Sequence, residues 1–308
     1  MTAPGTTFKG AAMLMATAVA WGGMFPVIKP LLGDYDPITL TMLRFGLAVP
    51  VLLLLLVLIE GPAALRPEGR ALRLWGLGTL GFAGFGLLLV LGLERTAPHR
   101  AAVMPALMPL IAIVIGAVRG RAAPSATAVT AVLLGLVGVI LVVSGGEPLR
   151  LLHGGVGGGE ALVLLGATCW VLYTLDVSTF AGWSGLRVTT LSLTAGTASI
   201  AAIWVLCLTA KISHVPSIAL LTNTMPALAY LVLAASVMGF LFWNAGMHAI
   251  GAKLGVLFII IVPITAFALA VVDGARPGPL EYTGVLLVIT ALLLNSLVPG
   301  IPATRQAA

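Results

Sequence analysis

The residue with the clearest chemical potential is a cation, Arg44, which lies inside the otherwise apolar stretch 38–58. Charge within such a stretch is costly and is usually either functional or paired. Arg44 therefore has two interpretations: it binds the carboxylate of a solute, or it pairs with a neighbouring acid, Asp34, Asp36 or Glu94. We expect the pairing, because an arginine this close to the end of a span can extend toward the interface.

A second charge, Asp176, lies in the apolar stretch 160–181. Two interpretations are balanced here. The carboxylate takes up and releases a coupling proton, or it pairs with Arg187 or Lys253 near the membrane surface. Asp176 is thus the candidate for ion coupling.

Aromatic and sulfur side chains gather at the depth expected for the middle of several apolar stretches. Such side chains form deformable apolar cavities that suit small amphipathic solutes. Asn244 adds a polar contact, because its amide group both donates and accepts hydrogen bonds. The sequence predicts a solute site lined by Trp21, Met24, Phe82, Phe85, Met108, Trp170, Tyr173 and Asn244.

Two prolines have a mechanical interpretation. Pro109 and Pro263 each remove a backbone hydrogen bond and permit a helix to bend. We expect them to act as hinges that open the cavity alternately to the two sides.

Other chemistry has weaker support. The run Gly182-Trp183-Ser184-Gly185 resembles the nucleophile motif of an intramembrane serine protease, with His248 as the base. We treat this as a remote alternative, because we expect Ser184 in a surface loop and not at a buried helix start. No phosphate-binding loop or metal-ligand spacing occurs, so we expect no cofactor, no metal site and no enzymatic activity.

The amino-acid composition indicates an integral membrane protein. Of the 308 residues, 60% are apolar and only 8% are charged, whereas about a quarter of an ordinary soluble domain is charged. The basic residues are scattered singly and form no patch with interleaved aromatics, so the net charge of +6 does not indicate nucleic-acid binding.

A spanning helix needs about 20 mostly apolar residues, and this rule predicts about ten spans. The Lys and Arg distribution places both termini in the cytoplasm, and we expect a multi-pass protein of the bacterial inner membrane. The predicted spans are 10–30, 38–58, 72–93, 98–118, 126–144, 160–181, 187–209, 225–248, 253–272 and 279–298.

The two halves of the chain look alike. A glycine-rich stretch near the middle separates residues 1–150 from residues 151–308, and Pro109 and Pro263 occupy equivalent places in the two halves. With five helices in each half, the second half enters the membrane from the opposite side. This is the inverted-repeat organisation of secondary transporters, with the site near the midplane.

Several motifs together resemble a known family. They are Trp21-Gly22 with Lys29, Arg44-Phe45, Cys169-Trp170 through Tyr173, Phe242-Trp243-Asn244, Pro263 and Gly284. Their order and spacing are similar to those of EamA-type members of the drug/metabolite transporter superfamily, and most of all to the aromatic amino acid exporters. After the fourth and ninth helices the chain departs from the family's frequent Gly-Glu, with Arg119-Gly120-Arg121 and Asp273-Gly274.

These observations predict an all-α membrane protein of ten transmembrane helices in two inverted five-helix repeats. The resemblance implies a secondary transporter that exports small metabolites, aromatic or other neutral amino acids above all, by alternating access. A passive facilitator (uniporter) or a drug exporter on the same scaffold remains an alternative. The expected partners are a small-molecule substrate and the lipid bilayer, and a monomer is expected.

Overall fold

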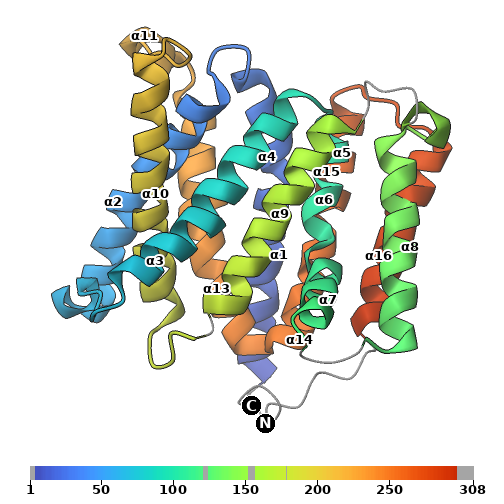
Figure 1. The fold of residues 1–308 in the computed structure, drawn as a ribbon, viewed down its shortest axis with the longest axis horizontal. Helices are drawn as coiled ribbons and strands as arrows, with labels where there is room; N and C mark the ends of the chain where they lie inside the picture. The colour runs from blue at the N-terminus through green and yellow to red at the C-terminus, as the bar shows by residue number, and fades with distance from the viewer. Residues whose placement is uncertain (1–3, 121–123, 152–156, 178, 297–308) are drawn as a thin grey trace.

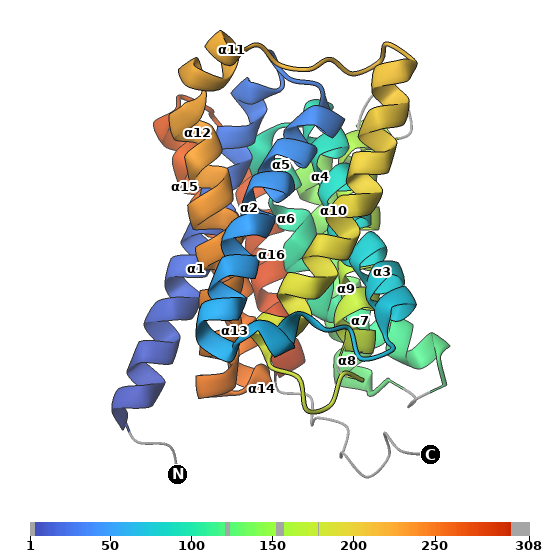
Figure 2. The ribbon, with the colours of Figure 1, turned by 90° about the vertical axis from the view of Figure 1, so that its left-hand side faces the viewer.

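All regular structure in the described part of the chain is helical. The computed structural model describes residues 4–120, 124–151, 157–177 and 179–296. Figures 1 and 2 show one bundle of long helices, in which α1 (Pro4–Leu31) begins and α16 (Pro279–Ser296) ends at the same end of the bundle. We call this the termini end, and the other the opposite end.

The first half of the chain builds a series of helices that cross the bundle back and forth. After α1 these are α2 (Pro37–Glu60), η1 (Pro62–Leu65), α3 (Ala71–Gly78), the π-helical η2 (Thr79–Gly84), α4 (Phe85–Glu94), α5 (Pro98–Ala101), α6 (Val103–Ala106), α7 (Met108–Val118) and α8 (Ala126–Val143).

The second half of the chain is helical as well. Its elements before α16 are η3 (Pro148–Leu151), α9 (Gly158–Val177), α10 (Gly185–Thr209), α11 (Ile218–Asn223), α12 (Met225–Ala229), the π-helical η4 (Tyr230–Met238), α13 (Gly239–Ile250), α14 (Ala252–Gly255), the 3₁₀ segment η5 (Val256–Ile260) and α15 (Ile261–Val272).

The prediction of a multi-spanning helical protein is confirmed, although the length criterion yields fewer spans than expected. Within the described residues, eight helices are long and apolar enough to cross a membrane, and the bent pair Pro98–Ala106 and Met108–Val118 makes a ninth if it counts as one span. The predicted segment 253–272 falls short because its continuous apolar helix covers only Val256–Val272.

Local sequence sets where the helices begin. Asp36 caps α2, with one carboxylate oxygen accepting from the N–H groups of Ile38 and Thr39 at 3.1 and 2.9 Å. Burial alone would raise the pKa of Asp36, but hydrogen bonds from Thr39, Ser213 and Ile38 hold this pKa below its usual range. The carboxylate thus stays ionised and keeps the start of α2 fixed.

The predicted bend near Pro109 is present. The helix axis turns by 42° between Pro98–Ala106 and Met108–Val118. Pro109, in the first turn of α7, cannot donate a hydrogen bond to the preceding turn, and Pro105 lies just before the break. Pro263 is buried in the first turn of α15, directly after the 3₁₀ segment η5.

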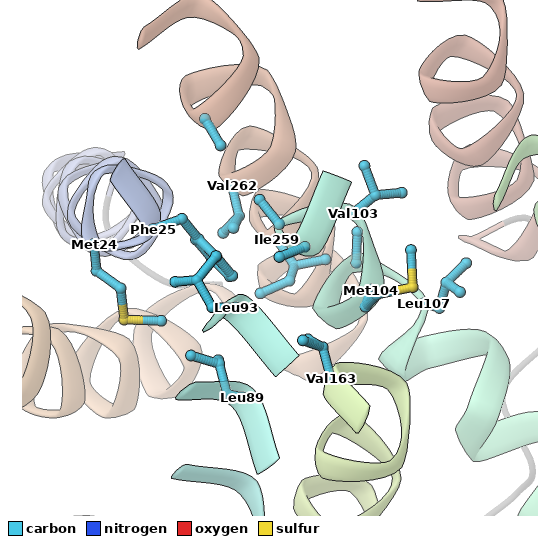
Figure 3. Close-up of a cluster of buried hydrophobic side chains, with 14 of the residues drawn as sticks. Met24, Phe25, Leu89, Leu93, Val103, Met104, Leu107, Val163, Ile259 and Val262 are labelled. Carbon is cyan, nitrogen blue, oxygen red and sulfur yellow. The ribbon is translucent and has the colours of Figure 1, made fainter. Parts of the chain in front are cut away.

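Aliphatic side chains fill the bundle toward the opposite end. Figure 3 shows Met24 and Phe25 of α1 facing Leu89 and Leu93 of α4, with side chains of α9, η5 and α15 around them. Phe25 and Leu93 are at most 1% exposed. These buried side chains pack around Phe25, which forms one boundary of the cavity described next.

Candidate functional site

A cavity of about 240 Å³ lies between helices of both halves of the chain. Its wall includes the predicted Trp21, Met24, Phe82, Phe85, Met108 and Trp170, together with Pro109. The sequence therefore identified side chains that do meet around one cavity, although they come from five separate helical segments. Residues of the wall that were not predicted as binding residues include Arg44, Phe45, Phe240, Trp243, Met247 and Ile259.

Phe82 is the centre of the aromatic wall. Its ring lies edge-on to Trp170, Tyr173 and Phe240, with centroid distances of 5.5, 5.3 and 5.5 Å. Such edge-to-face pairs contribute about 0.5–1.5 kcal/mol each beyond their buried area. The wall is thus a mutually packed set of rings, held from η2, α9 and α13.

Trp21 joins the first helix to this wall. Its ring lies 5.0 Å from Trp243 and 6.4 Å from Phe240, measured between centroids. Its indole N–H donates to the Ala235 carbonyl oxygen at 2.9 Å. The hydrogen bond fixes the orientation of the ring, so Trp21 presents a rigid apolar face.

The sequence carried a signal for the missed aromatic residues. Phe240, Trp243 and Met247 are spaced by three and four residues, so they share one face of α13. The same spacing places Trp21, Met24 and Phe25 on one face of α1. Periodicity around the Phe242-Trp243-Asn244 motif would therefore have identified Phe240.

Tyr173 and Asn244 line a neighbouring cavity of about 340 Å³, which shares Trp170, Thr174, Phe240 and Trp243 with the first. Tyr173 is only 4% exposed. The Asn244 amide donates to the Thr189 hydroxyl at 3.0 Å and to the Gly185 carbonyl at 3.3 Å. Its lining includes the end of α9 and the start of α10, and these helix ends lie at the termini end of the bundle (Figure 1).

The expected ion pair of Arg44 with Asp34, Asp36 or Glu94 is wrong. Arg44 is 4% exposed and lines the aromatic cavity, where its Nε donates to the Ser236 hydroxyl at 2.9 Å. The Asp36 carboxylate instead accepts hydrogen bonds from the Thr39 N–H at the start of α2 and from the Ser213 hydroxyl. Arg44 points into the bundle because its helical face is the buried face of α2.

Of the two interpretations of Asp176, a pairing with Arg187 is not what the structure has. Asp176 pairs with Arg119 at 3.0 Å, and both side chains are about one-third exposed. Arg187 pairs with Glu68 at 2.7 Å, because the turn before α10 directs it toward the loop after α2. The side chain of Lys253, the other expected partner, lies outside the described residues. Asp176 thus links the ends of α7 and α9 at the termini end.

The opposite end carries its own polar links. The Lys29 ammonium group donates to the carbonyl oxygens of Leu93, Glu94 and Thr96, at 2.8, 3.0 and 2.9 Å. Carbonyl groups at a helix end have no partner within the helix, so these bonds tie α1 to the end of α4. Arg100 and Glu281 form an ion pair of 2.9 Å at the same end.

Ser184 is exposed and lies in the loop directly before α10, as expected, where it caps the helix. Its hydroxyl accepts from the Arg187 N–H at 2.9 Å as a helix cap and also bonds to Glu60. We expect Ser184→Ala to lower the free energy of unfolding by about 1 kcal/mol and to leave transport unchanged, measured by thermal unfolding and solute flux. A loss of transport in the folded variant would show that the Ser184 hydroxyl has a role beyond capping the helix.

The described residues contain no group of three or more His, Cys, Asp or Glu side chains arranged to hold a metal ion. The two cysteines, Cys169 and Cys207, are free. The wall of the aromatic cavity is apolar apart from Arg44 and a few neutral polar groups. Such a wall can hold a small solute that has an apolar body and one charged group.

Comparisons with known proteins identify a matching family and relatives of similar length. The EamA-like transporter family matches residues 8–144. "Uncharacterized transporter YrdR" of Bacillus subtilis is 30% identical over 95% of this chain and 92% of its own length. "Uncharacterized transporter YyaM" of the same organism is 28% identical over 94% of each chain.

Two further likenesses are more distant. "Probable terminal-alkyne amino-acid exporter" of Streptantibioticus cattleyicolor is 26% identical over 91% of each chain. A solved crystal structure superposes on 99% of this chain and 99% of its own with a TM-score of 0.65, at 22% identity. The last likeness shows that the fold is shared.

Proposed function

The chain belongs to the EamA-like transporter family, and from this premise we propose that it exports small metabolites, amino acids above all, by alternating access. Membership of the family implies a small-molecule substrate and a chain embedded in the membrane. The observation that carries the proposal is the aromatic cavity, which helices of both halves line. Secondary transporters bind their solutes where their two halves meet.

An inverted repeat of residues 1–150 and 151–308, with ten helices in total, is part of the proposal. Matching contacts support it. The third long helix of each half contains a π-helical segment, η2 or η4. The first long helix of each half packs on the third of the other half, α1 on α13 and α9 on α4. A twofold axis in the membrane plane would produce these pairs.

The direction of opening follows from the two ends of the bundle. Lys29 and the aliphatic core close the opposite end, whereas the second cavity continues toward the termini end. With both termini in the cytoplasm, this conformation closes the outer side. Bending at the α6–α7 break beside Pro109, and at Pro263, would then open it.

Amino acids are favoured over other solutes by one relative, which is named an amino-acid exporter, and by the mixed apolar and cationic wall. A passive facilitator and a drug exporter remain the competing functions. The test is counterflow of radiolabelled amino acids in liposomes that carry the purified protein, with and without a pH gradient. Counterflow of phenylalanine or another neutral amino acid supports the proposal, and none with any amino acid overturns its substrate class.

The proposal includes ion coupling through Asp176, which a proton gradient across the liposome membrane tests. We expect Asp176→Asn to abolish any stimulation of counterflow by a proton gradient, because the amide cannot take up a proton. The basal rate should fall by no more than about threefold, since an exposed ion pair contributes less than about 1 kcal/mol.

Arg119→Gln is the matched control, because it breaks the same ion pair but keeps the carboxylate. Stimulation by the gradient should persist in this variant. Equal losses of this stimulation in the two variants would show that Asp176 acts only through its ion pair and does not carry the coupling proton.

A further inference from the structure

Arg44 is a buried cation without an acidic partner among the described residues. It is 4% exposed, and its one hydrogen bond within the described chain goes from Nε to Ser236. Its guanidinium carbon lies 4.9 Å from the Phe45 ring centroid. Arginine keeps its charge in proteins, and an unpaired charge in an apolar site is costly. A ligand anion would remove this cost.

The Arg44 side chain is held in a fixed orientation. Ser236 accepts from Arg44 Nε and donates its own proton to the Leu231 carbonyl oxygen at 2.9 Å. This second bond spans five residues within the π-helical segment η4, and π-helical turns often occur at functional sites. The arrangement engages Nε and leaves the two terminal nitrogens of the fork for a ligand, the pair that matches a carboxylate.

The rest of the cavity wall offers no opposite charge. Among the described residues that line either cavity, Arg44 is the only one with a formal charge. An ammonium group would find no anionic side chain there, only neutral acceptors such as the Thr174 hydroxyl and the faces of rings such as Trp21 and Trp170. The ring faces attract a cation weakly, by about 0.5–2 kcal/mol.

We propose that Arg44, oriented by Ser236, is the carboxylate-recognition group of this cavity, and that the solute class is small apolar carboxylates in which an amino group is dispensable. This inference rests on the proposed transport function and narrows its substrate class. It places organic acids with an aromatic or aliphatic body beside amino acids, and it excludes amines and cationic drugs.

Three probes with one phenylalkyl body separate the two charges: phenylalanine, 3-phenylpropionate and phenethylamine. Their affinities for the purified full-length protein are measured at pH 7.5 by quenching of tryptophan fluorescence, because tryptophan lines the cavity. We expect phenylalanine and 3-phenylpropionate to bind similarly and phenethylamine at least about tenfold more weakly, since a hydrogen bond to a charged group contributes about 1.5–3 kcal/mol.

Arg44→Gln should weaken both carboxylates by about 10- to 100-fold and leave phenethylamine unchanged or tighter. Ser236→Ala, which keeps the charge and is milder for folding, should weaken the carboxylates alone, by about three- to tenfold. Arg276→Gln removes one positive charge from an exposed loop and serves as the control with unchanged affinities.

The outcomes separate this inference from the transport proposal. Equal affinity for phenethylamine, or equal weakening of all three probes by Ser236→Ala, overturns carboxylate recognition by Arg44. Binding of 3-phenylpropionate without counterflow of any amino acid supports the inference and rejects amino acid export. Absence of binding by every probe overturns the inference, whereas counterflow of another amino acid would still support the transport proposal.

Discussion

Trp170→Ala is expected to lower phenylalanine counterflow by at least about tenfold, the loss that corresponds to about 1.4 kcal/mol. Trp170 lies 5.5 Å from Phe82, 5.5 Å from Phe85 and 5.2 Å from Tyr173 between ring centroids. Removing the indole ring takes away an aromatic face from the solute and the packing that holds three other rings. Initial counterflow rates in proteoliposomes, normalised to folded protein, give the measurement.

Trp75→Ala is the matched control for this prediction. Trp75 is 53% exposed near the start of α3 and belongs to neither cavity. Its replacement should change the rate by no more than about twofold, as expected for exposed positions without special contacts. Similar losses in both variants, or none in Trp170→Ala, would remove the aromatic wall from the transport mechanism.

Gly78→Ala is expected to cause the largest loss of stability, near or above the upper end of the roughly 1–3 kcal/mol cost of overpacking. A β-carbon at Gly78 would lie 2.1 Å from the Ser192 carbonyl oxygen and 2.8 Å from the Gly196 nitrogen. Both are backbone atoms of α10, so only a shift of a whole helix relieves the contact. The midpoint of thermal unfolding in detergent measures this effect.

Gly76→Ala, two residues earlier, isolates the cause. A β-carbon at Gly76 has no neighbour within 4 Å, and alanine favours a helix over glycine by about 1 kcal/mol. The midpoint should therefore stay unchanged or rise. A comparable fall in both variants would show that helix contact at Gly78 is not the reason, and α10 would then not be needed to hold η2 and Phe82 in place.

Hydropathy predicted the helical elements well because each span must satisfy its own backbone hydrogen bonds in lipid. The predicted 38–58 and 126–144 differ from the observed Pro37–Glu60 and Ala126–Val143 by no more than two residues at either end. The π-helical segments η2 and η4 were not predicted. Their sequences are as apolar as the α-helices around them, and packing decides the local hydrogen-bond pattern.

The cavity was predicted only in part. Trp21 and Trp170 were identified from their places in the chain, and the structure brings them into one wall. The partners of the charged residues were not. Ser236 is 192 positions from Arg44, and Arg119 is 57 positions from Asp176. The sequence indicates as partners only the acids and bases that lie near in the chain. The orientation of the helices brings other residues into contact instead.

The most direct test of the account is substrate protection of a single cysteine in the cavity. Thr174 lines both cavities, so Thr174→Cys, in a chain with Cys169 and Cys207 replaced by serine, is treated with a membrane-impermeant maleimide from each side. We predict reaction from the side that carries the termini, and slower reaction in saturating phenylalanine. Reaction only from the other side, or at a rate that phenylalanine does not change, would contradict transport through this cavity.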